Sequence, residues 1–200
     1  MGSVLNVISE WVEDDEQKEL LYERVPSLVL RWINEAQLRH VDRSEVLREI
    51  WEPTITSTGN TTLPSDFLRE IKDRVKWDTT THLYQVDYPA AALVESWSDT
   101  SFYSIWESSF YVWGAAAGTP SIPYIKKPAA LTTIATDNLE LPTENHGTLQ
   151  IYLDAVYARR NKDFQTYYSL LDRFDRRAQE EGGIFRNRRD PIPTMRSSRF

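Results

Sequence analysis

Two amphipathic patterns in the second half of the chain constrain its fold most. Between residues 143 and 160, and again from Phe164 to the pair Gly182-Gly183, apolar side chains recur three and four positions apart, which stacks them on one helical face. Polar residues 161–163 separate the two runs, and paired glycines favour a helix end. We therefore predict two helices, the first capped by Thr143 and the second ending at the glycines. Their apolar faces consist of Leu149, Tyr152, Leu153, Val156 and Tyr157, and of Phe164, Tyr167, Tyr168, Leu171, Phe174 and Ala178.

Shorter helical patterns occupy the first quarter of the chain. Residues 4–11 predict one helix, and the four acidic residues 13–16 suit the positive N-terminal end of the next. Pro26 opens a third helix, because proline is harmless where a helix needs no amide donor. Trp32 lies on the apolar face of that helix, so we expect it, like Tyr152, in the helical core.

Two further helices and several strands are predicted between these regions. Helices are expected over residues 43–51 and, after a capping serine, over residues 67–77. Residues 52–62 have the composition of a hairpin or an exposed arm. Residues 90–97 are compatible with a helix or a strand. The predicted strands cover residues 82–88, 102–106, 110–113 and 122–126.

Together these patterns predict a mainly α fold. We expect a helical bundle with a small antiparallel β insertion at about residues 82–127 and an extended C-terminal tail. The body would cover residues 1–183 and the basic tail residues 184–200. A chain of 200 residues with 40% hydrophobic content is long enough for one sizeable core.

Composition excludes several classes of protein. The chain has no cysteine, which removes disulfides and thiolate chemistry. No apolar run approaches the roughly 18 residues of a membrane span, and the N-terminus lacks the pattern of a signal peptide. We expect a soluble protein that is not secreted and has no membrane partner.

The charges are distributed unevenly along the sequence. Residues 1–183 carry 18 basic and 29 acidic side chains, a net charge of −11, whereas residues 184–200 carry five arginines against Asp190, a net charge of +4. An acidic body repels phosphate backbones, since Lys and Arg supply most non-specific binding to nucleic acids. A basic tail is typical of an arm that binds nucleic acid or an acidic partner.

No motif for catalysis is evident. His40, His82 and His146 lie on three predicted elements, outside any metal-binding spacing, and the segment GAAAG at residues 114–118 lacks the lysine of a phosphate loop. Seven tryptophans and ten tyrosines beside many carboxylates leave a carbohydrate-active hydrolase as the enzyme alternative. An unrelated helical interaction module is the other alternative. We expect no catalytic residue, no cofactor and no metal.

Four motifs, in this order, resemble those of the head-to-tail adaptor (connector, head-completion) proteins of tailed bacteriophages. They are WINEAQLRHV with its Asn-x-Ala centre, LPSDF, IPYIKKPAAL with its Tyr-x-Lys-x-Pro strand end, and DNLELPTENHGTLQIYLDAVYARRNKD. The motifs span much of residues 28–181. The sequence departs from the family pattern at residues 52–62 and 102–113.

The resemblance implies a non-enzymatic virion protein of the phage neck, assembled in the host cytoplasm. It implies a ring, usually of twelve copies, that sits beneath the portal protein, extends the DNA channel and carries a tail protein such as a nozzle, tube or stopper. Genomic DNA would pass an acidic ring without specific binding. Because acidic copies repel one another, we expect a monomer or weak oligomer that forms its ring only on the portal.

The C-terminal tail is the predicted portal-docking segment. It contains two prolines and no helical period, so we expect it to be extended in the free protein. Apolar side chains alternate with arginines, as in segments that order on binding, and the family's C-terminal extensions dock into the portal. DNA binding is one alternative role for this tail, and a terminus without any function is the other alternative. The predicted docking residues are Phe185, Arg186, Arg188, Arg189, Ile192, Met195, Arg196, Arg199 and Phe200.

Overall fold

The computed structural model describes residues 3–13, 15–55, 59–71, 74–77, 81–87, 101–114 and 117–189. It divides the chain into two compact units, each described here by itself. A helical unit combines residues 1–46 with residues 128–200, and a β unit consists of residues 47–127. Because parts of the helical unit flank it on both sides in the sequence, the β unit is an insertion into that unit, and it begins at residue 47.

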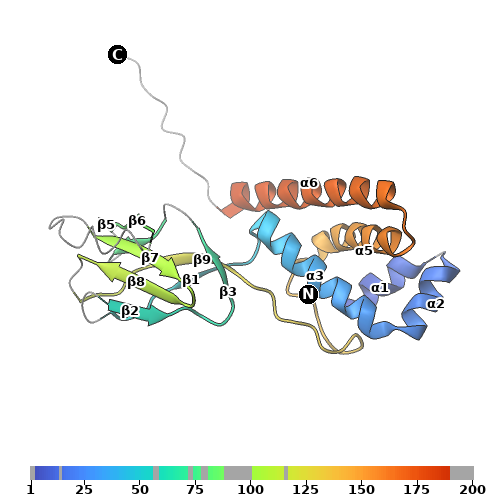
Figure 1. The fold of residues 1–200 in the computed structure, drawn as a ribbon, viewed down its shortest axis with the longest axis horizontal. Coiled ribbons are helices and arrows are strands. Elements are labelled where there is room, and N and C mark those ends of the chain that lie inside the picture. Colours follow the sequence, from blue (N-terminus) through green and yellow to red (C-terminus); the bar gives the residue numbers. More distant parts are fainter. Residues whose placement is uncertain are drawn as a thin grey trace, which may run out of the picture. The chain divides into compact units, whose positions relative to one another are not determined.

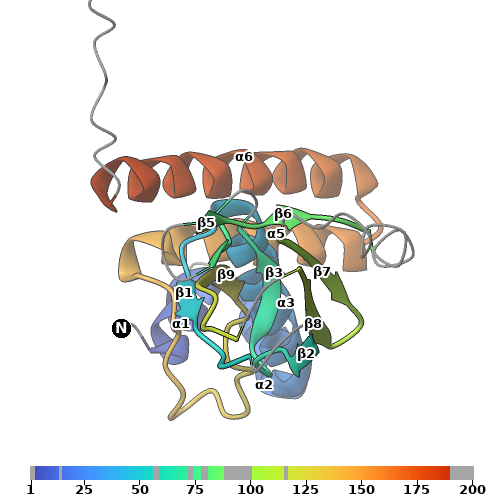
Figure 2. The same cartoon turned by 90° about the vertical axis from the view of Figure 1, so that its left-hand side faces the viewer.

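The described part of the helical unit is built from six helical segments (Figure 1). The long helix α6 packs along α3 and α5, whereas α1 packs on α5 and α2 on α3. In Figures 1 and 2, α6 and α2 lie on opposite sides of the unit, with α3 and α5 between them. The segments are α1 (Val4–Val12), α2 (Glu16–Arg24), α3 (Pro26–Ser44), the 3-10 turn η1 (Thr143–Asn145), α5 (His146–Arg160) and α6 (Phe164–Arg189).

Local signals start the first three helices where the sequence predicted them. The Ser3 side chain accepts a hydrogen bond from the backbone N–H of Leu5, and the Asp15 carboxylate accepts from the first turn of α2. Pro26 is the first residue of α3. These contacts span at most three residues, so the start of each helix is a local feature of the sequence.

The break between α5 and α6 is also confirmed. Lys162 has a φ of 62°, a left-handed conformation that a continuous helix does not contain. Asp163 then caps α6, because its Oδ1 accepts a hydrogen bond from Thr166 N at 3.1 Å. The predicted N-cap at Thr143 is wrong, since Thr143 begins η1 and Asn145 directly precedes α5.

The predicted helix stop at Gly182-Gly183 is wrong. Helix α6 continues through both glycines to Arg189, so residues 184–189 are helical and not extended. Gly182 is needed for another reason: a Cβ placed on it would lie against the carbonyl oxygen of Ser44 and 2.7 Å from Ser44 Cα. The close packing against α3 therefore explains why residue 182 is a glycine, and a helix end does not.

The β unit contains nine strands among its described residues, arranged in three sheets (Figure 1). The strand orders are β1-β9-β3, β2-β8-β7-β6 and β4-β5. Neighbouring strands are antiparallel, except that β6 runs parallel to β7. The strands are β1 (Arg48–Trp51), β2 (Gly59–Thr62), β3 (Phe67–Glu70), β4 (Lys76–Trp77), β5 (Thr81–His82), β6 (Tyr84–Gln85), β7 (Phe102–Trp106), β8 (Ser109–Trp113) and β9 (Ile122–Lys126).

This architecture corrects the predicted fold class. The chain is a mixed α and β protein, not a mainly α bundle with a small insertion. The helices predicted over residues 43–51 and 67–77 are wrong, because α3 ends at Ser44 and strands β1, β3 and β4 follow. Short apolar segments fit both periods, and here pairing with the distant β9 decides, as in the partnership of Arg48 with Ile125.

The other predictions for residues of the β unit are confirmed only in part. The strands at residues 102–106, 110–113 and 122–126 are confirmed as β7, β8 and β9. The predicted strand at residues 82–88 is replaced by the short β5 and β6. In the range 52–62, predicted as a hairpin or an exposed arm, the described residues pair with distant segments: β2 pairs with β8, and Ile55 is buried beside Gly118. Residues 90–97 lie outside the described residues.

Each unit has its own apolar core. The largest fully buried side chains of the helical unit are Ile8, Ile33, Leu139, Leu141, Leu149, Leu153 and Phe174. In the β unit, Tyr103 stacks on Phe110, with ring centroids 5.4 Å apart. The core of that unit consists of Ile55, Val75, Trp77, Leu83, Tyr103, Phe110, Val112 and Ile122. Trp32 is buried as predicted, and Tyr152 is half-buried against Phe174.

Candidate functional site

The predicted portal-docking residues fall partly on α6. Phe185, Arg186, Arg188 and Arg189 lie in its last turns, so this part of the predicted tail continues a helix. The remaining predicted docking residues, Ile192, Met195, Arg196, Arg199 and Phe200, lie outside the described residues. The candidate site is therefore α6 itself, from its exposed middle turns to its last turn.

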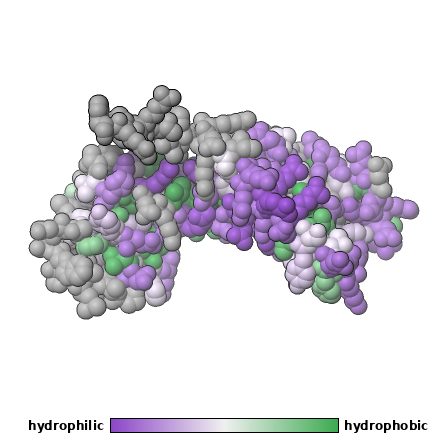
Figure 3. Space-filling model, turned by 90° about the horizontal axis from the view of Figure 1, so that it is seen from above, coloured by the Kyte–Doolittle hydropathy of each residue, from purple (hydrophilic) through white to green (hydrophobic). Residues whose placement is uncertain are grey.

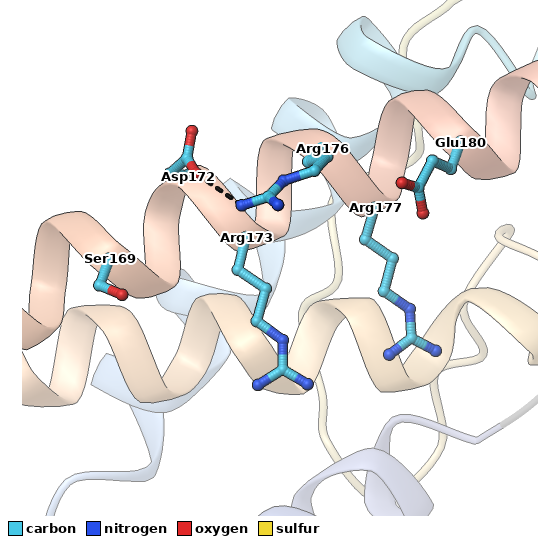
Figure 4. A pocket seen from close by; sticks show the side chains of 6 residues that line it. All are labelled: Ser169, Asp172, Arg173, Arg176, Arg177 and Glu180. Atoms are coloured by element: carbon cyan, nitrogen blue, oxygen red, sulfur yellow. Dashed lines mark hydrogen bonds and ion pairs between the residues drawn. The ribbon is translucent and has the colours of Figure 1, made fainter.

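The outer face of α6 carries an open, polar groove of about 430 Å³ (Figure 4). Arg176 donates to Asp172 at 2.8 Å across one turn, an exposed pair that fixes neither side chain strongly. Arg173 has no ion-pair partner in the described ranges and points, like Arg177, towards α5 (Figure 4). Seen from above, this face of the helical unit is largely hydrophilic (Figure 3). The groove is lined by Ser169, Asp172, Arg173, Arg176, Arg177 and Glu180.

The inner face of α6 is held by a partly buried carboxylate, that of Glu181. Glu181 Oε2 accepts hydrogen bonds from His40 Nε2 at 2.7 Å and from Asn145 Nδ2 at 2.8 Å, while its Oε1 accepts from Thr148 Oγ1 at 2.6 Å. His40 belongs to α3, Asn145 to η1 and Thr148 to α5. One carboxylate thus connects α6 to the three other segments, and Arg177 adds a fourth contact at 3.3 Å.

The pKa of Glu181 reflects this setting. Burial acts to raise the pKa of the carboxyl group, but the hydrogen bonds from His40 and Thr148 and the nearby positive charges outweigh it. The net effect lowers the pKa of Glu181, so the carboxylate stays ionised. Burial lowers the pKa of the neighbouring His146. The cluster therefore orients α6, with its fully buried His40 serving as a structural partner.

The adaptor-like motifs also acquire a structural explanation in the helical unit. Asn34, the asparagine of the Asn-x-Ala motif, donates to Leu131 O at 3.0 Å and accepts from Leu131 N at 2.8 Å. Asp137 accepts hydrogen bonds from the backbone N–H groups of Thr133 and Thr132, and these bonds lower its pKa. Both polar residues hold the segment that leads into α5.

A second polar cluster joins two other motifs in the β unit. The Tyr124 hydroxyl of β9 lies 3.1 Å from a carboxylate oxygen of Glu49 in β1 and 3.1 Å from one of Asp66, which precedes β3, so the two acceptors share its single hydrogen. Lys126 Nζ lies 3.1 Å from Glu49 and 3.9 Å from Asp66. The Leu-Pro-x-Asp and Tyr-x-Lys-x-Pro motifs therefore meet, and together they join all three strands of one sheet.

The charges of this β-unit cluster follow from its contacts. Burial, followed by the hydrogen bonds with Glu49 and Asp66, raises the pKa of Tyr124. The hydrogen bonds from Lys126 and Tyr124 lower the pKa of the exposed Glu49. The sequence analysis did not predict this contact, although Tyr124 and Lys126 lie two positions apart, on one face of a strand.

The three histidines lie on three different elements of the described chain. His40 is buried, His82 is exposed on β5 in the other unit, and His146 begins α5. Among the described residues, no three His, Asp or Glu side chains are grouped so as to hold a metal ion. The helices in these ranges are also too short or too polar to cross a membrane.

Comparison with known proteins supplies the identification. A search of curated proteins found no match. The family model described as SU10 adaptor protein matches residues 1–196, which is nearly the whole chain and includes both units. The chain therefore belongs to the SU10 adaptor protein family, a family of phage head–tail adaptors, as the four motifs indicated.

Proposed function

We propose that the chain forms a ring beneath the portal of a tailed bacteriophage, where it joins the head to the tail and continues the DNA channel. The single observation that carries this proposal is the family match over residues 1–196. Membership in this family implies a structural role in the virion neck, contact with portal and tail components, and no enzymatic role. The ring, its twelve copies and its position on the portal are our proposal.

The helical extension of α6 supports a docking role for the C-terminus. Glu181 and Gly182 lie where α6 packs on the rest of the helical unit, and the helix continues from there to Arg189. The eleven residues that follow reach at most about 40 Å when extended. They include Ile192, Met195, Arg196, Arg199 and Phe200, a mixture of apolar and basic side chains suited to an acidic groove with apolar pockets on the portal.

The net charge supports assembly on the portal and passage of DNA. With a net charge of −7 per copy, free subunits repel one another, and a ring closes where the portal sets the rotation between neighbours. An acidic channel would let genomic DNA pass without counterion release at lysine or arginine contacts. We propose that the free protein is a monomer or weak oligomer in the host cytoplasm before it joins the virion.

A truncation after Arg189 tests the docking step. This cut keeps the whole of α6, so we expect unchanged helicity by circular dichroism. The full-length chain and the truncated chain are each mixed with purified portal protein from the same phage genome and imaged in negative stain. We expect a collar only with the full-length chain. A truncated chain that decorates the portal at full occupancy would overturn docking by the tail, and a full-length chain that never decorates it would overturn the ring.

A further inference from the structure

Two helices on opposite sides of the helical unit carry exposed groups of opposite charge. On α6, the groove contains the three arginines Arg173, Arg176 and Arg177 beside Asp172 and Glu180. On α2, the glutamates at positions 16, 19 and 23 are exposed. Because α6 and α2 lie on opposite sides of this unit, each copy presents the arginines of the groove on one side and the carboxylates of α2 on the other (Figures 1 and 2).

The outward stripe of α2 is complementary to the groove on α6. Glu16, Glu19 and Glu23 recur at three- and four-residue spacing and are exposed, and none of their side-chain carboxylates has a hydrogen bond or ion pair within the described part of the chain. Leu20, which is 40% exposed, lies among these carboxylates. From Glu16 to Glu23 the stripe is about 10 Å long, the same rise as from Arg173 to Glu180 on α6.

The α6 side offers matching partners. Arg173 has no ion-pair partner among the described residues, and Arg176 is held only by an exposed pair with Asp172. Tyr168, which is 65% exposed, lies one turn before Asp172 on the same side of the helix and offers an apolar surface for a leucine. Asp172 and Glu180 stand among the arginines, which favours a helix of mixed composition over a phosphate backbone.

We infer that the groove on α6 binds the outward stripe of α2 from a second copy of the same chain. The contact is head-to-tail, because the two surfaces lie on opposite sides of one subunit, so repetition produces a ring or a filament. This inference rests on the proposed function, since the portal decides whether the repeated contact closes into a ring. Exposed ion pairs are individually weak, so the contact is compatible with a monomer away from the portal.

Because the chain has no cysteine, a cross-linking reagent specific for thiols reacts only at cysteines that are introduced by mutation. The full-length double variant E19C/R173C is assembled with purified portal protein and treated with a short bismaleimide. We expect a ladder of covalent oligomers, because each copy has one reactive site on each of two sides. The controls are E19C alone, R173C alone and E19C/T136C, whose second cysteine lies on an exposed turn outside both surfaces. None of the controls should produce a ladder.

A charge exchange gives an independent readout. Relative to wild type, E16R/E19R and R173E/R176E should each weaken ring formation on the portal about tenfold, and the combined four-site variant should recover most of the loss. Raising the salt concentration from about 0.1 M to about 1 M should reduce the yield of the ladder, since exposed charges are then screened.

The outcomes separate this inference from the proposed function. Copies that decorate the portal without an E19C/R173C ladder overturn the α2–α6 contact and leave the ring in place. Copies that never attach overturn both. Dimers formed efficiently by E19C alone indicate a two-fold contact and overturn the head-to-tail arrangement. A DNA duplex retarded in a gel by the wild type but not by R173E/R176E makes the groove a nucleic-acid surface, which also overturns the inference.

Discussion

The helical unit and the β unit are stabilised by different kinds of polar contact. In the helical unit, Glu181 is enclosed by groups from three other segments, and one of them, His40, is fully buried. In the β unit, the corresponding cluster around Tyr124 is partly exposed to solvent, because its Glu49 side chain is exposed. A buried polar group left without its partner costs more free energy than an exposed one, so the two clusters should respond differently to the same kind of change.

The two clusters therefore have different roles: one positions a helix, and the other helps to hold the strands of a sheet together. The Glu181 cluster determines where α6 lies, and with it the groove and the path to the C-terminus. The Tyr124 cluster joins strands that backbone pairing already holds together. Changes near Glu181 should therefore alter attachment to partners through the position of α6, whereas changes near Tyr124 should alter mainly the local stability of the β unit.

The largest expected effect distinguishes the two cores. Phe174 and Phe110 are both fully buried, one in each unit. Each change to alanine should cost about 3–5 kcal/mol of unfolding free energy, through lost burial and a residual cavity. Hydrogen exchange followed by mass spectrometry should show faster exchange in helical-unit peptides for Phe174→Ala and in β-unit peptides for Phe110→Ala. Equal acceleration in both units would mean that they unfold as one cooperative body.

The partly buried carboxylate of Glu181 provides the next test. Glu181→Gln replaces an ionised acceptor and should cost about 1.5–3 kcal/mol, the range for hydrogen bonds to charged groups. Because the folded-state pKa of Glu181 lies below its ordinary value of 4.5, its stabilising contribution is present above pH 4.5 and is lost as the pH falls through the folded-state pKa. The difference between wild type and variant in urea denaturation should therefore shrink in acid.

Glu180 is the matched control for Glu181. It is adjacent in sequence but exposed on the outer face of α6, so Glu180→Gln should change the unfolding free energy by less than about 0.5 kcal/mol. If the two variants are equally stable at neutral pH, Glu181 does not anchor the helix.

The two glycines of α6 give a smaller effect with opposite signs. Gly182→Ala pushes a methyl group into the backbone of Ser44 and should destabilise the helical unit by about 1–3 kcal/mol. At Gly183 a Cβ would have no described neighbour within 4 Å, so Gly183→Ala should stabilise the helix by about 0.5–1 kcal/mol. Thermal denaturation of both variants checks this. Stabilisation by Gly182→Ala would contradict the close contact between α6 and α3.

The smallest expected effect is in the β unit. Tyr124→Phe removes the hydroxyl that joins Glu49 and Asp66 and should cost about 0.5–1.5 kcal/mol, while the ring keeps its stacking on Phe67. Chemical denaturation of the variant, with hydrogen exchange to locate the change in the β unit, is the measurement. A loss as large as that of Phe110→Ala would show that this polar cluster, and not strand pairing, holds the sheet.

The sequence by itself determined the features that depend on neighbours within about four residues. The proline that opens α3, the apolar face of α5 and the break before Phe164 are all local, and each is found where the pattern placed it. The predicted apolar face of α6 is confirmed only in part, because Phe174 and Ala178 are buried whereas Phe164 and Tyr168 are exposed. The order of the four motifs also indicated the family, although their individual roles became visible only when the structure paired Asn34 with Leu131 and Tyr124 with Asp66.

Only the tertiary structure decided the remaining features, because they depend on partners far away in the sequence. The segments around residues 48–51 and 67–70 carry apolar patterns that suit a helix or a strand, and pairing with β9 selects the strand. Gly182 permits a helix end as well as a helix contact, and the close approach of Ser44 selects the contact. The surfaces of the proposed α2–α6 contact follow the same rule: the sequence contains the charges of both helices, but the packing of α3 and α5 between them places those charges on opposite sides of one subunit.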